Sequence, residues 1–239
     1  MLAFDNVTRL FRGGAGVTDL TFTVEPGEIV ALIGLNGAGK TTLMRLALGM
    51  LRAQHGTVRL LGHALEGMHM AAWARVGTLI EVPLAYPELT VRQNLHIACL
   101  LHDCNPRRVE ASISAWGLDL VADRRFRRLS LGNRQRVGLA AALQHDPRLI
   151  VLDEPSNTLD PASVILLREQ LEHRACAGAA ILISSHHLDE VARIADRVLL
   201  MNAGRLIGEL DTAGSDLERA FFERIRQDDE DRMATEVAG

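Results

Sequence analysis

A glycine-rich segment, Gly34-Leu-Asn-Gly37-Ala-Gly39-Lys40-Thr41, matches the P-loop pattern in full and lies between an expected strand and an expected helix. Its glycines let backbone N–H groups surround an anion without a blocking side chain, and the following helix adds the positive end of its dipole. Lys40 can reach the β and γ phosphates of a nucleotide, and the Thr41 hydroxyl can ligate Mg²⁺. We therefore predict a nucleotide-phosphate site formed by Gly34, Asn36, Gly37, Ala38, Gly39, Lys40, Thr41 and Thr42.

Two adjacent acids, Asp153 and Glu154, end a short apolar run later in the chain. A carboxylate at the carboxyl end of a strand in a doubly wound sheet faces the crevice in which a P-loop ligand binds. Asp153 is predicted to belong to the Mg²⁺ shell, and Glu154 is predicted to orient or deprotonate the attacking water. An apolar run that ends in two acids is common by itself. Only its combination with the P-loop indicates that these acids bind Mg²⁺ and orient water.

Strands and helices alternate along the chain in a way that can position these groups. Strands are expected at residues 4–7, 20–24, 28–33, 57–61, 76–80, 149–152, 180–183, 198–201 and 205–210, and helices at 40–49, 161–172 and 188–195. Residues 83–144, approximately, have apolar positions at helical spacing and are expected to form a mainly helical insert. This alternation predicts a parallel α/β sheet. Residues 1–210 are expected to form one domain, and residues 211–239 a C-terminal helix with an acidic, solvated and frayed tail.

Composition excludes several classes of protein. The 239 residues are 48% hydrophobic, and 26 basic against 30 acidic side chains give a net charge of −4. Sequence-independent nucleic-acid binding depends on basic patches, so no nucleic-acid partner is expected. The apolar runs are far shorter than the roughly 20 residues of a membrane span, and no signal peptide is visible. The cysteines Cys99, Cys104 and Cys176 are expected to be unpaired thiols, as in a reducing cytosol, rather than a metal site or a disulfide framework.

A third motif, Leu129-Ser-Leu-Gly-Asn-Arg-Gln-Arg136, opens a helix between the P-loop and the acidic pair. With it, residues 3–210 resemble the nucleotide-binding domain of an ABC transporter. The resemblance implies an α/β fold with a RecA-like P-loop NTPase core, an N-terminal antiparallel β subdomain and a helical insert. It also assigns roles to single positions: adenine stacking to Phe11, signature-motif contacts to Ser130 and Gly132, the D-loop aspartate to Asp160 and the switch histidine to His186.

The signature motif also implies an assembly. Ser130 and Gly132 begin a helix, so they can offer a hydroxyl, backbone N–H groups and a positive dipole end to an anion. In the family that the sequence resembles, this group contacts the γ-phosphate held by the P-loop of a second copy. ATP and Mg²⁺ are therefore the expected ligands, and a homodimer or a paralogous heterodimer of ATP-binding domains is the expected assembly.

Several positions depart from the commonest family pattern, among them Leu35, Leu131, Asn133 and Thr158. The most informative departure is Glu81, which stands where the family has the Q-loop glutamine. This residue and the following Tyr-Pro-Glu-Leu-Thr run resemble the ATPases of bacitracin- and lantibiotic-type resistance exporters. The alternative is that Glu81 is a tolerated substitution that carries no information about the substrate. Its carboxylate can still contact Mg²⁺ or its waters, so it is a candidate both for catalysis and for metal binding.

The resemblance implies a function that no single motif states. We expect the ATP-hydrolysing subunit of a bacterial ABC transporter, peripheral on the cytoplasmic face of the membrane and bound to separate permease subunits. Residues 81–105, approximately, are expected to form the groove for a cytoplasmic helix of the permease. Export of a peptide antibiotic, a lipid-like compound or a drug is the leading interpretation. A soluble ABC ATPase of cofactor assembly and an importer subunit are the alternatives.

Overall fold

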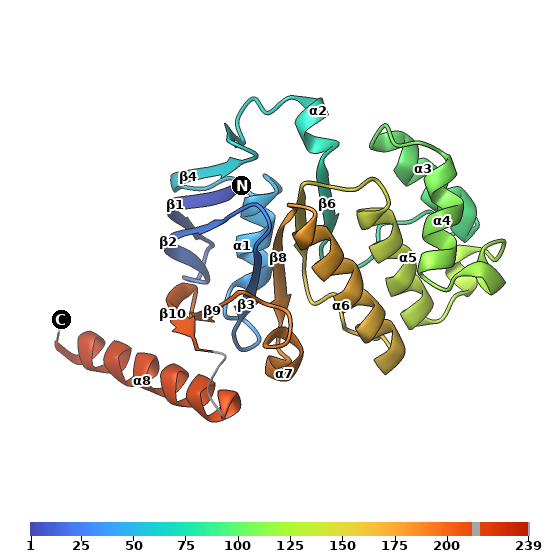
Figure 1. Cartoon of the computed structure of the whole chain (residues 1–239). Coiled ribbons are helices and arrows are strands. Elements are labelled where there is room, and N and C mark those ends of the chain that lie inside the picture. Colours follow the sequence, from blue (N-terminus) through green and yellow to red (C-terminus); the bar gives the residue numbers. More distant parts are fainter. Residues whose placement is uncertain (212–215, 239) are drawn as a thin grey trace.

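Two β-sheets, with helices on both faces of the larger one, carry the fold (Figure 1). The structure is a computed structural model, and it describes residues 1–211 and 216–238. The smaller sheet has the strand order β2-β1-β4-β5, and the larger sheet has the order β10-β9-β3-β8-β7-β6. Within the described ranges, no helix combines the length and the apolar composition needed to cross a bilayer.

The smaller sheet is antiparallel and comes from the N-terminal part of the chain. It consists of β1 (Leu2–Leu10), β2 (Gly16–Val24), β4 (His55–Leu60) and β5 (His63–Ala64). Alternate side chains of β2 are buried, and Phe4 of β1 stacks on Phe22 of β2 with the ring centroids 4.8 Å apart. Because the period of a strand is two residues, this alternation puts one face of the sheet against the rest of the protein.

The larger sheet is parallel except at one edge. Its strands are β3 (Ile29–Ile33), β6 (Val76–Leu79), β7 (Leu149–Leu152), β8 (Ala180–Ser185), β9 (Arg197–Asn202) and the antiparallel β10 (Arg205–Leu210). Every residue of β3, β7 and β8 is buried, as expected for strands covered on both faces. Alternate residues of β3 belong to two different hydrophobic clusters, one shared with α1 (Lys40–Ala47) and the other with α5 (Leu131–Leu143) and α6 (Pro161–Cys176). The carboxyl ends of β3, β7 and β8 therefore meet at one edge of a rigid sheet.

The insert is helical, as the sequence predicts. After the short α2 (Met70–Trp73), it contains α3 (Val91–Leu101), α4 (Arg107–Ala115) and α5, with two 3₁₀ turns at Asp119–Val121 and Phe126–Arg128. A capping box opens α3: the Thr90 side chain accepts from the Gln93 backbone, and the Gln93 side chain accepts from the Thr90 backbone. The side chain of Gln144 donates to the carbonyl of Leu95 at 2.8 Å, which ties α3 to the end of α5.

The expectation of unpaired thiols is wrong for two of the three cysteines. Cys99 and Cys104 form a disulfide across the end of α3, whereas Cys176 is a free and exposed thiol. The turn after α3, in which Asp103 has a φ of 51°, folds the chain back so that the two Cα atoms lie 5.0 Å apart. Spacing alone did not reveal this turn. The cysteine content therefore no longer supports the inference of a reducing compartment.

The C-terminal segment contains a helix, as the sequence predicts, but it is not the frayed, solvated tail that we expected. Residues Leu217–Ala238 form one helix, α8, which lies against β9 and β10 (Figure 1). Phe221 and Ile225 of this helix are buried in the core cluster of the larger sheet. The Asn202 side chain donates to Asp228 and to Asp229, both at 2.8 Å, so part of the acidic run is bound to the sheet. The helix α7 (Leu188–Val191) is shorter than predicted, and a domain boundary at residue 210 stays a prediction.

A pair of histidines links the insert to the core and makes stability depend on pH. The rings of His102, at the end of α3, and His145, after α5, stack with their centroids 3.8 Å apart, and His145 Nε2 lies 3.3 Å from the carbonyl oxygen of Val76. Burial lowers the pKa of His145 to about 4 and also lowers the pKa of His102. Between pH 6.5 and 4, approximately, the unfolded chain therefore binds a proton at His145 that the folded chain does not.

We expect the free energy of unfolding to fall by about 1–2 kcal/mol through His145 as the pH drops from about 7.5 to about 5. Denaturant unfolding at the two pH values measures this fall. His145→Gln should reduce it, whereas His96→Gln, at an exposed position on α3, should leave it unchanged. An equal fall in the wild type and in His145→Gln would contradict the assignment.

Candidate functional site

The P-loop connects β3 to α1 and has the backbone geometry of a phosphate cradle. Gly37 and Gly39 have φ values of 84° and 104°, in the left-handed region that favours glycine. A Cβ at Gly34 would lie 2.3 Å from the carbonyl oxygen of Met201, so only glycine fits there. Lys40 is the first residue of α1, and its Nζ donates to the carbonyl of Gly34 at 2.7 Å. The lysine side chain thus lies over the loop whose N–H groups would face an anion.

Thr41 and Asp153 come together as the sequence predicts. The Thr41 hydroxyl donates to Asp153 Oδ2 at 2.7 Å, and the Ser184 hydroxyl donates to Asp153 Oδ1 at 2.6 Å. The Asp153 side chain is only 4% exposed, so these hydrogen bonds hold both carboxylate oxygens in place.

This pair of oxygen donors fits Mg²⁺. The ion prefers hard oxygen ligands and commonly takes only one or two from protein side chains, the rest being water and substrate phosphates. In the part of the chain that the structure describes, no cluster of three or more His, Cys, Asp or Glu side chains could hold a metal alone. Thr41 and Asp153 are therefore suited to a cation that arrives together with a nucleotide.

Glu154 lies between the P-loop lysine and the histidine that follows β8. Its Oε1 is 3.6 Å from Lys40 Nζ, and its Oε2 is 2.7 Å from His186 Nδ1. Its backbone N–H donates to the Ser184 hydroxyl at 2.8 Å, and its φ is 47°. The carboxylate is thus held from both sides, which is what the orientation of a water molecule requires.

Ser184 has a role that the sequence did not reveal. One hydroxyl contacts both acids: it donates to the Asp153 carboxylate and accepts from the Glu154 backbone. The register between β7 and β8, in which Leu152 pairs with Ile183, places Ser184 beside Asp153. The sequence shows Ser184 two residues before His186, but it does not show this register.

The signature motif and the D-loop contact each other. Ser130 caps α5, and its hydroxyl accepts from the Asn133 backbone at 3.3 Å. A Cβ at Gly132 would lie 2.9 Å from the Thr158 carbonyl oxygen, so glycine permits this close approach. Asp160 caps α6 by accepting from the Ser163 backbone at 2.7 Å, and the hydrogen bonds from Ser163 lower the pKa of this carboxyl. These residues form a second group on the D-loop side of the site.

Phe11 and Glu81 lie outside the hydrogen-bonded network of Lys40, Thr41, Asp153, Glu154, Ser184 and His186. Phe11 follows β1 and is 40% exposed, and the guanidinium of Arg9 lies 5.3 Å from the centroid of its ring. An exposed aromatic face beside a cation offers a stacking surface. Glu81 follows β6, and its carboxylate is paired with Arg45 on α1. Sequence reasoning gave no signal for Arg45.

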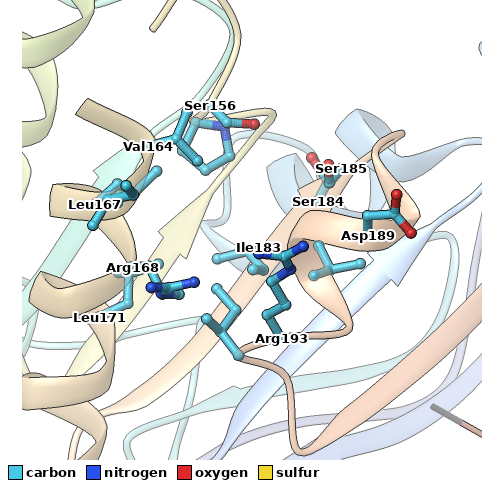
Figure 2. A pocket seen from close by; sticks show the side chains of 14 residues that line it. Ser156, Val164, Leu167, Arg168, Leu171, Ile183, Ser184, Ser185, Asp189 and Arg193 are labelled. Atoms are coloured by element: carbon cyan, nitrogen blue, oxygen red, sulfur yellow. The ribbon is translucent and has the colours of Figure 1, made fainter. Parts of the chain in front are cut away.

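A cavity of about 280 Å³ lies behind Ser184, between α6 and the segment that follows His186 (Figure 2). Its apolar lining includes Leu167 and Leu171 of α6 and Ile183 of β8 (Figure 2), together with Val191 and Ile194 from α7 and the turn after it. Charged side chains also line it: Arg168 from α6, Asp189 from α7 and Arg193 from the turn that follows α7. The helix α6 and the segment that follows His186 are thus separated by this cavity.

The family model for ABC transporters matches residues 17–157. The uncharacterized ABC transporter ATP-binding protein YhcH of Bacillus subtilis is 33% identical over 235 residues, which cover 96% of this chain and 77% of that protein. The bacitracin transport ATP-binding protein BcrA of Enterococcus faecalis is 38% identical over 211 residues, covering 86% and 68%. The Nod factor export ATP-binding protein I of Rhizobium etli is 35% identical over 210 residues, covering 86% and 66%.

Solved structures agree on the fold. A structure of an ATP-binding subunit of an ABC transporter superposes with a TM-score of 0.83 at 28% identity, covering 94% of each chain. A dimeric structure of a bacterial ABC transporter cassette superposes with a TM-score of 0.81 at 20% identity, covering 90% of this chain and all of that one. The fold and the site thus define a P-loop nucleotide-binding domain of the ABC ATPase class, which confirms the predicted fold class. More particularly, the chain belongs to the ATP-binding subunits of ABC transporters, and it is an ATPase.

Proposed function

We propose that this subunit powers export through separate permease subunits, at the cytoplasmic face of the membrane. One observation supports ATP hydrolysis at this site: Thr41 contacts Asp153, while Lys40 and His186 contact Glu154 on either side. The direction of transport is supported by the relatives, one of which transports bacitracin and another of which exports Nod factor. The glutamate at position 81 also supports export, because it resembles the residue at this position in the ATPases of bacitracin-type resistance exporters.

The hydrolytic step follows from the positions of these side chains. The N–H groups of the P-loop and the ammonium of Lys40 would contact the β and γ phosphates of ATP. These contacts would stabilise negative charge on the phosphoryl oxygens. Glu154 would orient the attacking water and accept its proton, and His186 would keep the carboxylate aligned through its hydrogen bond. Thr41 and Asp153 would hold Mg²⁺, which when bound would supply neutralisation of the negative charge on the phosphates.

A second copy would complete each site. Ser130 is exposed at the start of α5, beside the backbone N–H groups of the first helical turn. A phosphate held by the P-loop of another copy would fit this helix end, with Gly132 allowing the backbone to approach. Adenine would stack on Phe11 of the copy that supplies the P-loop. Asp160 would lie near the same interface, because it belongs to the D-loop that contacts Gly132.

The permease contact is proposed for the start of the insert. Residues 81–105 expose several large apolar side chains: Val82, Leu84, Tyr86, Leu100 and Leu101. Exposed apolar side chains gathered in one segment mark an interaction surface more often than they mark free solvent contact. A cytoplasmic helix of a permease subunit would bury them.

Transport by the reconstituted complex tests the direction. The chain and its permease subunits are placed in vesicles with the ATP-binding subunit facing outward, and labelled bacitracin and ATP are added outside. We expect ATP-dependent accumulation inside, which corresponds to export from a cell, and none with Lys40→Ala because the point charge on the phosphates is lost. ATP-dependent movement only from the inside of the vesicles to the outside, measured with labelled bacitracin loaded inside, would contradict export.

A further inference from the structure

An ion pair joins the helix after the P-loop to the segment that leads into the insert. Arg45 Nη2 donates to Glu81 Oε1 at 2.5 Å. Arg45 lies in the last turn of α1, the helix that begins with Lys40. Glu81 comes shortly after β6, which ends at Leu79. The pair therefore connects the phosphate-binding helix with the start of the segment that we assign to the permease contact.

The backbone at Glu81 is strained. Its φ is 61°, and the N–H of Val82 donates to the carbonyl of Ile80 at 2.8 Å. A hydrogen bond between residues two apart, across a residue with positive φ, defines a γ-turn of the rare kind. Glycine adopts such a backbone freely, but a residue with a Cβ does not. Strain of this type persists where surrounding contacts hold it, and the Glu81 side chain contacts the Arg45 guanidinium.

The charges near the P-loop explain how the ion pair of Arg45 and Glu81 affects nucleotide binding. Asp153 and Glu154 already bring two carboxylates, and the Lys40 ammonium lies 3.6 Å from Glu154. The carbonyl of Leu79, two residues before Glu81, accepts from the Asp153 backbone at 2.8 Å, so Glu81 leaves the sheet beside these acids, where ATP would add several negative charges. A glutamate at position 81 contributes a further negative charge where a glutamine would contribute none. Because like charges repel, that carboxylate weakens nucleotide binding unless a cation neutralises it.

We propose that Arg45 is a positioning residue for the nucleotide site, which neutralises the Glu81 carboxylate and holds it in place. Position 81 can then carry a carboxylate without repelling the phosphates of ATP. This inference rests on the proposed function, because it requires ATP at the P-loop. The side chains of Arg45 and Glu81 are 38% and 53% exposed, so their mutual attraction is partly screened, and the effect on nucleotide affinity is expected to be moderate.

A double-mutant cycle on the full chain tests the proposal through binding rather than turnover. The probe is the Mg²⁺ complex of AMPPNP, and its affinity is measured by titration calorimetry for the wild type, Arg45→Gln, Glu81→Gln and the double variant. We expect Arg45→Gln to weaken binding about three- to tenfold at low salt. Glu81→Gln should bind at least as tightly as the wild type, and the double variant should match Glu81→Gln. High salt should reduce the defect of Arg45→Gln, because screening shortens the reach of the exposed carboxylate.

Two controls separate this proposal from simpler explanations. Arg52→Gln removes another exposed ion pair after α1, in which Arg52 lies 3.0 Å from Glu66, and it should leave the affinity unchanged. Lys40→Ala should abolish binding. Wild-type affinity in Arg45→Gln, or a defect that remains in the double variant, would overturn the role of Arg45. Full binding by Lys40→Ala would instead overturn the nucleotide site itself.

Discussion

Glu154→Gln should bind ATP nearly as well as the wild type while steady-state hydrolysis falls by at least about 100-fold. The amide cannot accept a proton from the attacking water, and it pairs with His186 less strongly than the carboxylate does. The contacts expected to hold the phosphates, from the P-loop N–H groups and Lys40, stay in place. ATP should therefore persist and hold two copies together, so that the variant sediments as a dimer with ATP.

Steady-state ATPase rates and sedimentation velocity with ATP and with ADP check this result. Glu169→Gln, an exposed substitution on α6, serves as the matched control and should behave like the wild type. Wild-type turnover by Glu154→Gln would show that this carboxylate is not the catalytic base. A variant that neither binds ATP nor dimerises would assign Glu154 to phosphate binding instead.

Ser130→Arg should have the second large effect. It places a bulky cation at the start of α5, where the partner's γ-phosphate would dock, and it leaves the chain's own P-loop untouched. We expect nucleotide affinity of the monomer to survive, while ATP-driven dimerisation is lost and hydrolysis falls by about 100-fold. Equilibrium binding, sedimentation and ATPase rates are measured on the same preparation.

Loss of the helix cap is the simplest competing cause, because the Ser130 hydroxyl accepts from the Asn133 backbone. Ser130→Asp keeps a capping side chain but brings a negative charge toward the phosphate. It should therefore fold like the wild type and yet fail to dimerise with ATP. Full hydrolysis by Ser130→Arg would contradict the assignment of residues 129–136 as a signature motif.

The phosphate chemistry could be predicted because it is local. The P-loop residues are contiguous, and the acids end an apolar strand whose carboxyl end must face the crevice of a parallel sheet. Thr41, Asp153, Glu154 and His186 accordingly lie in one network in the structure. Helical spacing likewise predicted the insert, since amphipathic periodicity is a property of neighbouring residues.

Features that depend on distant partners could not be predicted. The contact of Ser184 with both acids depends on the register between β7 and β8. The ion pair of Arg45 joins residues 36 positions apart, and the acidic run of α8 is bound by Asn202 from β9. A run of charged residues predicts a solvated segment, because no neighbouring residue indicates which strand the run will contact. The disulfide of Cys99 and Cys104 was missed for a different reason: the two residues are close in the chain, but their spacing does not reveal the turn that brings them together.

Mixing two inactive variants tests the composite nucleotide site most directly. A heterodimer of Ser130→Arg with Lys40→Ala has both lesions in one composite site, whereas the other site is fully wild type. Sedimentation of the mixture with ATP should therefore show a dimer that neither variant forms alone. If the mixture stays monomeric while the wild type dimerises under the same conditions, the head-to-tail arrangement of P-loop and signature motif is contradicted.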